Sequence, residues 1–271
     1  MNFYKHIEYK PGQQIWRILP TDDDKVVIEK RDTEDKQVYF DCIELENKNN
    51  IFKNLQLEEK FWIGIETIQN GIILFHKFAK PDMPGHKEII AFDMEKQKIL
   101  WQNEEFAYLF LYKDKVYCYK ELFEGRKFLA LNHKTGEVIE ELGEDAQKIN
   151  EIYDRSRAEE KFSSYIFPQT HSHSDQKIQS RIDELKSGLA IFGDVEYNIL
   201  DGTLLTSYHI KKEDNSLVNK FSAIDIETGE EKFSNVLCEN IDKFMTDSFF
   251  VYKEYLFLLK EKTEIMIYKI D

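Results

Sequence analysis

Two histidines in the middle of the chain are the most suggestive grouping for metal chemistry. His171 and His173 flank Ser172. In an extended segment, side chains two residues apart point to the same side and could share a metal ion. No cysteine or second ligand pair nearby completes a tetrahedral set. We therefore expect an exposed polar loop here, with the two histidines as weak candidates for metal ligands.

A second grouping lies at the ends of strand-like runs. The runs end on Glu29-Lys30-Arg31, His76-Lys77, Lys120-Glu121, Tyr208-His209 and Lys260-Glu261. If these runs are equivalent strands of repeated units, their polar ends fall on one face and could line a shared pocket. The alternative is that the strands simply end in solvent. The candidate binding residues from this pattern are Glu29, Arg31, His76, Lys120, Tyr208 and His209.

No catalytic motif stands out. The 51 acidic residues include no pair that spacing selects for glycosidase chemistry. Trp16, Trp62 and Trp101 could stack on a sugar, but packing between sheets explains such tryptophans more often. The sequence has no P-loop, no G-x-G-x-x-G after a strand, no G-x-S-x-G and no H-E-x-x-H. We expect no cofactor.

Composition and charge limit the partners and the compartment. The net charge of −14 opposes binding to phosphate backbones and anionic lipids, so we expect neither nucleic acid nor membrane as a partner. The first residues lack the apolar stretch of a signal peptide, which favours a cytoplasmic protein. Cys42, Cys118 and Cys238 are far apart and lie in apolar runs, so we expect them to be reduced and mostly buried.

The elements that would position these residues come from a repeat. An eleven-residue pattern begins at residues 42, 91, 130 and 223, and its clearest copy reads A-I-D-I-E-T-G-E-E-K-F. It predicts a β-hairpin in which an Asp, Asn or Glu caps the turn. Gly136 and Gly229 are expected to have positive φ, with Asn and Lys in the equivalent place of the looser copies. A large apolar residue, Trp101 or Phe233, packs after the turn.

Two further strand-like runs precede each copy, so each unit consists of four short strands in meander order. The last unit has only three strands, at 248–253, 255–260 and 264–270. We expect residues 3–9 to pair with them as the outer strand and to close the ring. The prediction is an all-β chain, a small β-propeller of five four-stranded blades in a single domain, 1–271.

The pattern A-x-D-x-x-T-G-x-x-x-W resembles the repeat of quinoprotein-type (PQQ-like) β-propellers; residues 223–233 match it best and 91–101 next. The order of segments, with I-W-R-I-L-P at 15–20 and V-E-Y-N-I-L at 195–200, is also similar to an uncharacterised bacterial propeller-like family of unknown function. The resemblance implies a fold and no activity. The quinone-dependent dehydrogenases of this kind are larger, exported and calcium-binding, which argues against that function for this chain.

Residues 143–190 break the repeat between the third and fourth units. Residues 144–160 and 175–187 have helix-forming composition, and the second stretch places three apolar residues on one face. The alternative is a sixth, degenerate blade. If the helices pack on the blades, Ile149, Ile152, Ile178, Ile182 and Leu185 should be buried. Tyr165 and Phe167 would then be candidates for an exposed contact surface, unless the insertion merely covers a blade edge.

These features favour a non-catalytic binding or scaffold function, with a protein as the most plausible partner. The alternative is an enzyme that acts on a carbohydrate or another small molecule at the propeller axis.

Overall fold

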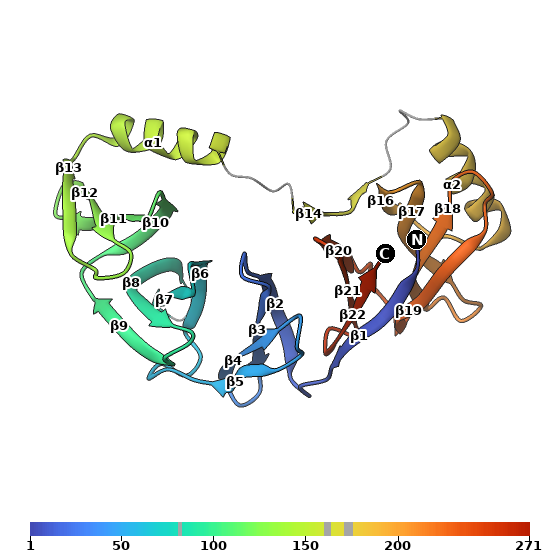
Figure 1. Cartoon of the computed structure of the whole chain (residues 1–271), viewed down its shortest axis with the longest axis horizontal. Coiled ribbons are helices and arrows are strands. Elements are labelled where there is room, and N and C mark those ends of the chain that lie inside the picture. The colour runs from blue at the N-terminus through green and yellow to red at the C-terminus, as the bar shows by residue number, and fades with distance from the viewer. Residues whose placement is uncertain (81–82, 160–163, 171–175) are drawn as a thin grey trace. The chain divides into compact units, whose positions relative to one another are not determined.

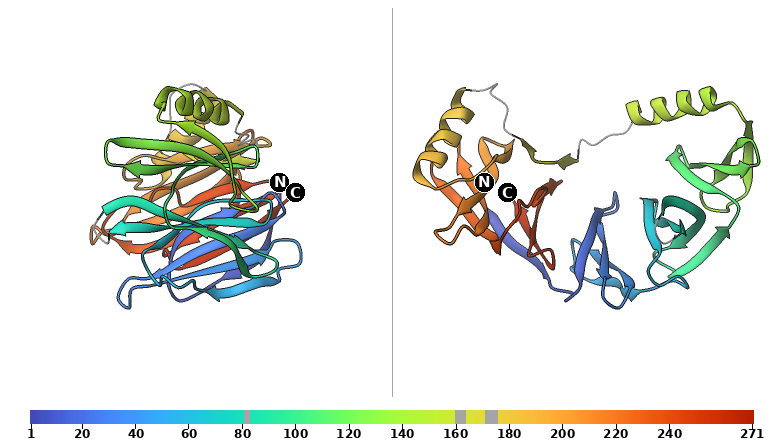
Figure 2. Two further views of the ribbon diagram at one scale, coloured as in Figure 1. Left: turned by 90° about the vertical axis from the view of Figure 1, so that its left-hand side faces the viewer. Right: turned by 180° about the vertical axis from the view of Figure 1, so that it is seen from behind.

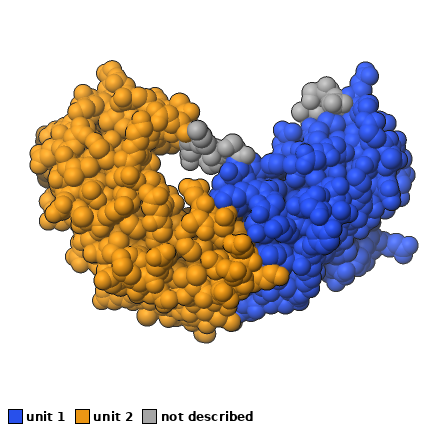
Figure 3. All heavy atoms as spheres, viewed as in Figure 1, with its two compact units in different colours: residues 1–14, 161–271 blue, residues 15–160 orange. Residues whose placement is uncertain are grey.

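The structure is a computed structural model that describes residues 1–80, 83–159, 164–170 and 176–271. Its strands form five antiparallel sheets of four or five strands, accompanied by two helices (Figures 1 and 2). Contacts divide the chain into two compact units, one of residues 1–14 and 161–271 and the other of residues 15–160 (Figure 3). We call them unit 1 and unit 2 and describe each by itself.

Unit 2 contains three four-stranded meanders and one helix. The first sheet comprises β2 (Gln14–Pro20), β3 (Lys25–Asp32), β4 (Gln37–Glu44) and β5 (Asn50–Leu55). The second comprises β6 (Ile63–Gln69), β7 (Ile72–Lys80), β8 (Met83–Asp93) and β9 (Lys98–Asn103). The third comprises β10 (Ala107–Tyr112), β11 (Lys115–Leu122), β12 (Gly125–Asn132) and β13 (Val138–Gly143), followed by α1 (Ala146–Glu159).

Unit 1 contains the remaining two sheets. One comprises β15 (Gln169–Thr170), β16 (Glu196–Leu200), β17 (Thr203–Lys211), β18 (Leu217–Asp225) and β19 (Glu231–Ile241). The other has the order β1-β22-β21-β20-β14, with β1 (Phe3–Tyr9), β14 (Tyr165–Ile166), β20 (Phe249–Tyr252), β21 (Tyr255–Lys260) and β22 (Glu264–Ile270). The helix α2 (Gln176–Gly188) precedes β16.

The hydrophobic cores lie between neighbouring sheets of the same unit because successive residues of a strand face opposite sides. In β7, Ile73 and Phe75 join a core with the β2–β5 sheet, whereas Ile72 and Leu74 join a core with the β10–β13 sheet. A sheet that is apolar on both faces must be covered on both. This explains why the strands are short, apolar and rich in aromatic residues.

The hairpin turns of the repeat are built as the sequence predicts. The Oδ1 atom of Asp225 accepts hydrogen bonds from the backbone N–H groups of Glu227, at 3.0 Å, and Thr228, at 2.9 Å. Asp93 and Asn132 make the equivalent bonds in their own turns. These bonds satisfy backbone donors that the turn leaves without a strand partner.

The positive φ angles of these turns fall where the repeat places them, with one correction. Gly136 has a φ of 72° and Gly229 a φ of 77°. In the two looser copies the position is occupied by Lys48, with a φ of 62°, and by Gln97, with a φ of 51°. The expectation of Asn at one of them was therefore wrong. Gly136 has a second reason to be glycine, since a Cβ atom there would meet the Trp101 ring at 2.6 Å.

The predicted pairing of the N-terminal strand is confirmed. β1 pairs with β22 in antiparallel register, from Phe3 opposite Ile270 to Tyr9 opposite Ile265. This completes a four-stranded meander from the two ends of the chain and covers an edge that would otherwise be open. Five four-stranded meanders are the sheet make-up of a small β-propeller, and the predicted fold class is confirmed.

The segment 143–190 contains the two predicted helices. Ile149 and Ile152 of α1 are buried against the β10–β13 sheet, and Ile178 and Ile182 of α2 against the β16–β19 sheet. Leu185 is only partly buried. The strands β14 and β15 each add an edge strand to an existing sheet of unit 1, and the described residues contain no sixth sheet.

Candidate functional site

One histidine pair and a glutamate converge on the middle sheet of unit 2. The ligand atoms of Glu66, His76 and His86 lie within 4.8 Å of one another. Glu66 comes from β6, His76 from β7 and His86 from β8. These are three adjacent strands, so the cluster depends on strand register rather than on a flexible loop.

Irregularities in both ladders lie at the cluster. The register of β6 and β7 shifts between Ile65 and Thr67, which leaves Glu66 as an extra residue. The register of β7 and β8 shifts around His76, between Phe75 and Lys77. Such bulges turn a side chain away from the regular alternation and are common beside functional sites. Gly64 lies opposite His76, and Phe78 lies opposite His86, so Glu66 and His86 are both close to diagonal neighbours of His76 across the two ladders.

The geometry of the cluster is close. Oε1 of Glu66 is 2.7 Å from Nδ1 of His86 and 3.1 Å from Nδ1 of His76. The two imidazole rings stack with centroids 3.5 Å apart and planes 7° from parallel. Burial raises the pKa of the Glu66 carboxyl, but the contacts with His76 and His86 outweigh burial and the net pKa lies below its ordinary value. The carboxylate is therefore ionised and faces both rings.

The ring of His76 is buried, and its two nitrogens lack hydrogen bonds of good geometry. Its side chain is 1% exposed, and neither nitrogen makes a hydrogen bond of good geometry to a described residue. Gly64 allows this placement, because a Cβ atom there would lie 3.0 Å from the His76 ring and 3.8 Å from an Arg31 nitrogen. Buried polar atoms without partners are uncommon in folded proteins and need a specific explanation.

Arg31 and Glu29, two of the predicted binding residues, lie beside this cluster and hold two sheets together. Arg31 pairs with Glu29 at 2.7 Å and donates hydrogen bonds to the carbonyls of Phe61, at 3.1 Å, and Ile63, at 2.7 Å. Arg17 likewise donates to the carbonyl of Ile65. Because β6 is an edge strand, its outward carbonyls have no strand partner, and the two arginines satisfy them.

Lys120, another predicted residue, borders an open hollow next to the cluster. The hollow has a volume of about 480 Å³, and His86 and Lys120 both line it. Lys120 is half-exposed and pairs with Glu105 at 2.5 Å, while the Arg126 guanidinium lies 4.2 Å from the centre of the Tyr119 ring. The structure thus places Glu29, Arg31, His76 and Lys120 in neighbouring parts of unit 2.

Tyr208 and His209 belong to unit 1. Tyr208 is fully buried, and its hydroxyl lies 2.9 Å from the Ser222 hydroxyl. The Nε2 atom of His209 accepts a hydrogen bond from the Met245 backbone N–H at 3.0 Å, and burial lowers the pKa of the imidazole. His209 is therefore neutral at physiological pH.

The Phe192 and Phe244 rings form an exposed aromatic pair above His209. Their centroids are 5.6 Å apart, and the rings are 46% and 49% exposed. The edge of His209 meets the Phe244 ring at 5.1 Å, and a Cβ atom on Gly193 would collide with that ring at 2.6 Å. Phe192 lies in the loop that follows α2, and Phe244 lies in the loop that follows β19. Close contacts with Gly193 and His209 hold the Phe244 ring in place.

The predicted aromatic surface of the insertion is partly exposed. Phe167 is 53% exposed, and Tyr165 is half-buried. Their rings stack at 5.5 Å, and Tyr165 contacts Tyr252 of β20 at 4.6 Å. Tyr165 thus anchors the strand β14, and Phe167 is the member of the pair that a partner can reach. His171 and His173 lie outside the described residues.

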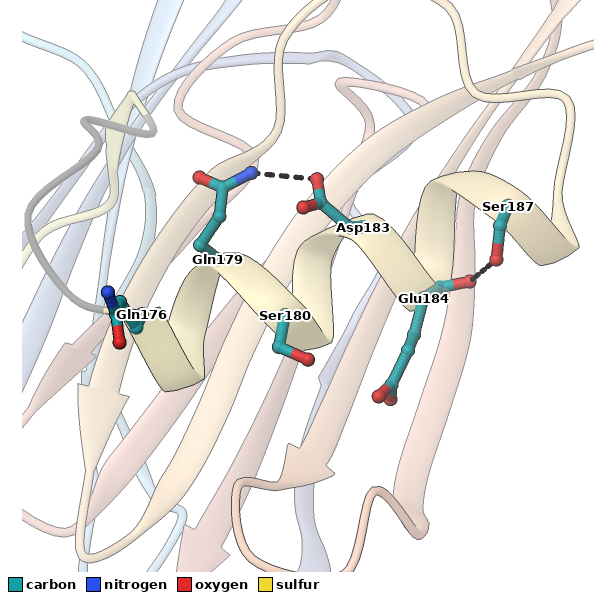
Figure 4. A pocket seen from close by; sticks show the side chains of 6 residues that line it. All are labelled: Gln176, Gln179, Ser180, Asp183, Glu184 and Ser187. Carbon is teal, nitrogen blue, oxygen red and sulfur yellow. Dashed lines mark hydrogen bonds between the residues drawn. The ribbon is translucent and has the colours of Figure 1, made fainter.

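Two other features carry no chemistry. Cys42, Cys118 and Cys238 are free and buried, as predicted, and burial raises the pKa of Cys42 and of Cys118 to about 12, which removes their nucleophilicity at neutral pH. An open hollow of about 520 Å³ on α2 is lined only by exposed polar helix residues (Figure 4). Two of these, Gln179 and Asp183, hydrogen-bond each other at 2.7 Å.

Glu66, His86, Phe192 and Phe244 were missed by the sequence reading. His76 was predicted at the end of a strand-like run, but His86 lies between that run and the repeat copy that begins at residue 91. The sequence therefore predicted no pairing between the two histidines, nor between either of them and Glu66. The two phenylalanines are 52 positions apart in loops that sequence patterns do not bring together.

Comparisons with known proteins find one family model that matches part of the chain and distant structural likenesses. Residues 19–101 match the model of a "Domain of unknown function (DUF4905)". No curated protein matches the sequence. Among solved structures, the chain is similar to a europium-containing methanol dehydrogenase at 12% identity and a TM-score of 0.35, covering 96% of this chain and 52% of that one.

Two further solved structures are similar at the same level. One is the uncharacterised protein lmo1340 from Listeria monocytogenes, at 9% identity and a TM-score of 0.34, covering 97% of this chain and 95% of that one. The other is the β-propeller domain of the Trilobed protease from Pyrococcus furiosus, at 14% identity and a TM-score of 0.33, covering 96% and 69%. Likenesses this distant say nothing about activity. No helix among the described residues is long and apolar enough to cross a membrane.

Proposed function

We propose that this chain is a non-catalytic binding protein whose partner is another protein. The observation that carries the proposal is the aromatic pair of Phe192 and Phe244 in unit 1. Two half-exposed rings stacked at 5.6 Å present apolar area to solvent that the fold does not require for its core. Aromatic side chains, Phe among them, are enriched at the cores of protein interfaces.

The pair is held in place before any partner arrives. Phe244 rests against Gly193 and the edge of His209, whose Nε2 also holds the backbone at Met245. Rigid aromatic contacts lose little conformational entropy on binding, which favours affinity. Lys211 lies 5.2 Å from the centre of the Phe192 ring and adds a positive charge at the rim. A partner with an apolar side chain and a nearby carboxylate would fit this surface.

The competing function, an enzyme acting on a small molecule, is less well supported. Four glutamates line the hollow beside His86, and three of them form ion pairs. Glu88 pairs with Lys77 at 3.0 Å, and Glu105 with Lys120 at 2.5 Å. Glu121 pairs with Arg126 at 3.1 Å. Each of these three carboxylates thus has a cationic partner within 3.1 Å.

The test is affinity capture with matched variants of the full chain. We expect the double variant Phe192→Ser/Phe244→Ser to fold normally and to lose a protein that the wild type retains. Phe123→Ser is the control, since Phe123 is fully exposed at a hairpin tip of unit 2. The captured protein is then identified and purified, and its affinity measured by calorimetry should fall by more than about tenfold for the double variant.

Two outcomes would count against this placement. If Phe123→Ser weakens capture as much as the double variant does, the exposed aromatic residues bind proteins non-specifically. If Phe167→Ser abolishes binding and the double variant does not, the contact surface lies on the insertion instead.

A further inference from the structure

We propose that Glu66, His76 and His86 form a binding site for a divalent transition-metal ion, with Zn²⁺ as the best fit. The site lies in unit 2 and is independent of the aromatic pair in unit 1. Two imidazoles and one carboxylate are a donor set that Zn²⁺ accepts, at bond lengths of about 2.0–2.2 Å. Neutral imidazole nitrogen suits Zn²⁺ and its neighbours in the first transition row better than Mg²⁺ or Ca²⁺.

The separations between the donor atoms agree with one shared ion. Ligands of a tetrahedral zinc lie about 3.3 Å apart, as its bond lengths require. Nδ1 of His76 is 3.1 Å and Nδ1 of His86 is 2.7 Å from Oε1 of Glu66. Small shifts outward would bring these atoms to the spacing of a bound ion.

The buried histidine is the observation that points to a ligand. His76 is 1% exposed, neither ring nitrogen makes a hydrogen bond of good geometry to a described residue, and Nδ1 lies only 3.1 Å from Oε1 of Glu66. A coordinated ion would satisfy that nitrogen and neutralise the Glu66 charge together. Without it, the fold leaves a polar ring buried at a bulge, where an apolar residue would pack at lower cost.

One adjustment is needed on binding. A metal ion lies in the plane of each coordinating imidazole, whereas the two rings are stacked 7° from parallel. His86 can tilt because its side chain is 35% exposed and the preceding residue is Gly85, which has only Ala79 within 4 Å of its Cβ position. His76 cannot move in the same way, since its ring is packed against Gly64.

Three protein ligands leave one tetrahedral position for water or an exogenous group. His86 lines the hollow of about 480 Å³, so a small molecule could reach that position from the hollow. The site therefore has the ligand count of an open metal centre rather than a closed structural one.

The experiment is isothermal titration of Zn²⁺ and of Mg²⁺ into the full chain, without a histidine tag and stripped of metal by a chelator. We expect one Zn²⁺ per chain, no binding of Mg²⁺, and a rise in the melting temperature with Zn²⁺. His86→Gln removes a ligand at a half-exposed position and should retain the fold. Loss of a group that only hydrogen-bonds a metal ligand typically lowers metal affinity by about 10–100-fold. Because His86 is itself a ligand, the zinc affinity of His86→Gln should fall by more than this.

Two matched controls make the result decisive. His6→Gln removes a histidine of unit 1, and His171→Gln/His173→Gln removes the other histidine pair of the sequence. Both variants should bind Zn²⁺ like the wild type. The proposal is overturned if the stripped chain binds no Zn²⁺. It is also overturned if His86→Gln binds as well as the wild type, or if the His171/His173 variant alone loses binding.

Discussion

At the scale of single residues, His209 makes the fold sensitive to acid. Its Nε2 accepts the Met245 N–H, which requires the neutral ring, and burial lowers its pKa below the ordinary 6.5. The unfolded chain takes up this proton more readily than the folded chain does. The stabilising contribution is therefore complete above about pH 6.5 and is lost as the pH falls through the lower folded pKa.

We expect the urea midpoint to fall between about pH 7 and about pH 5, and to fall less steeply in His209→Gln, because glutamine keeps an acceptor but does not titrate there. The measurement is a set of urea unfolding curves for both proteins across this range. Equal slopes for wild type and variant would show that His209 does not carry the effect.

A buried ion pair between two strands of the first sheet of unit 2 provides a second test. Lys30 of β3 and Asp41 of β4 are almost fully buried, and Nζ lies 2.9 Å from Oδ2. Lys30 also donates to the Asn54 side chain at 2.6 Å, and the Asn54 N–H donates to Asp41 at 2.7 Å. Removing one charge leaves the other buried and uncompensated.

Asp41→Asn should therefore destabilise the protein by about 3–5 kcal/mol, the typical cost of breaking a buried pair. The double variant Lys30→Met/Asp41→Leu should cost less, since it leaves no buried charge. Urea unfolding measures both. A double variant as unstable as the single one would mean that the pair contributes mainly through packing.

At the scale of elements, the edge strand β1 should stabilise the last sheet of unit 1. It pairs with β22 along its length, and Phe3 stacks on Phe233 at 4.8 Å. A chain that begins at Pro11 should expose the edge of β22, melt at a lower temperature and aggregate. Phe3→Ser should lower the melting temperature in the same direction, whereas Tyr4→Ser, at a 54% exposed position, should not. A shortened chain that melts like the full one would refute this role.

The repeat predicts elements well because each hairpin is locally encoded. Asp93, Asn132 and Asp225 cap their own turns, and alternating apolar residues define both faces of a strand. The pairing of residues 3–9 with the last strand followed from counting unpaired strands. The metal cluster could not be predicted in this way. Glu66, His76 and His86 lie on three different strands, and the repeat does not encode the register of these strands, which includes an extra residue at Glu66.

The positions of the remaining candidates depend on tertiary contacts. Arg31 was predicted from its place at a strand end, but its role follows from the open carbonyls of β6, which no local pattern reveals. The aromatic pair needs two loops to meet, and Gly193 to leave room for Phe244. The sequence thus identified candidate residues by their position at strand ends. It did not predict which residues each of them contacts, because those contacts depend on the tertiary structure.

For the molecule as a whole, we propose that the chain binds a protein through the aromatic pair of Phe192 and Phe244. The most direct measurement replaces Phe244 by a photo-crosslinking phenylalanine analogue in the full chain, and replaces Phe123 in a matched control. Phe123 is the more exposed of the two, at 102% against 49%, so non-specific adhesion would favour the control. We predict a discrete protein adduct from position 244 and none from position 123. Adducts from both positions alike, or from position 123 alone, would contradict the claim.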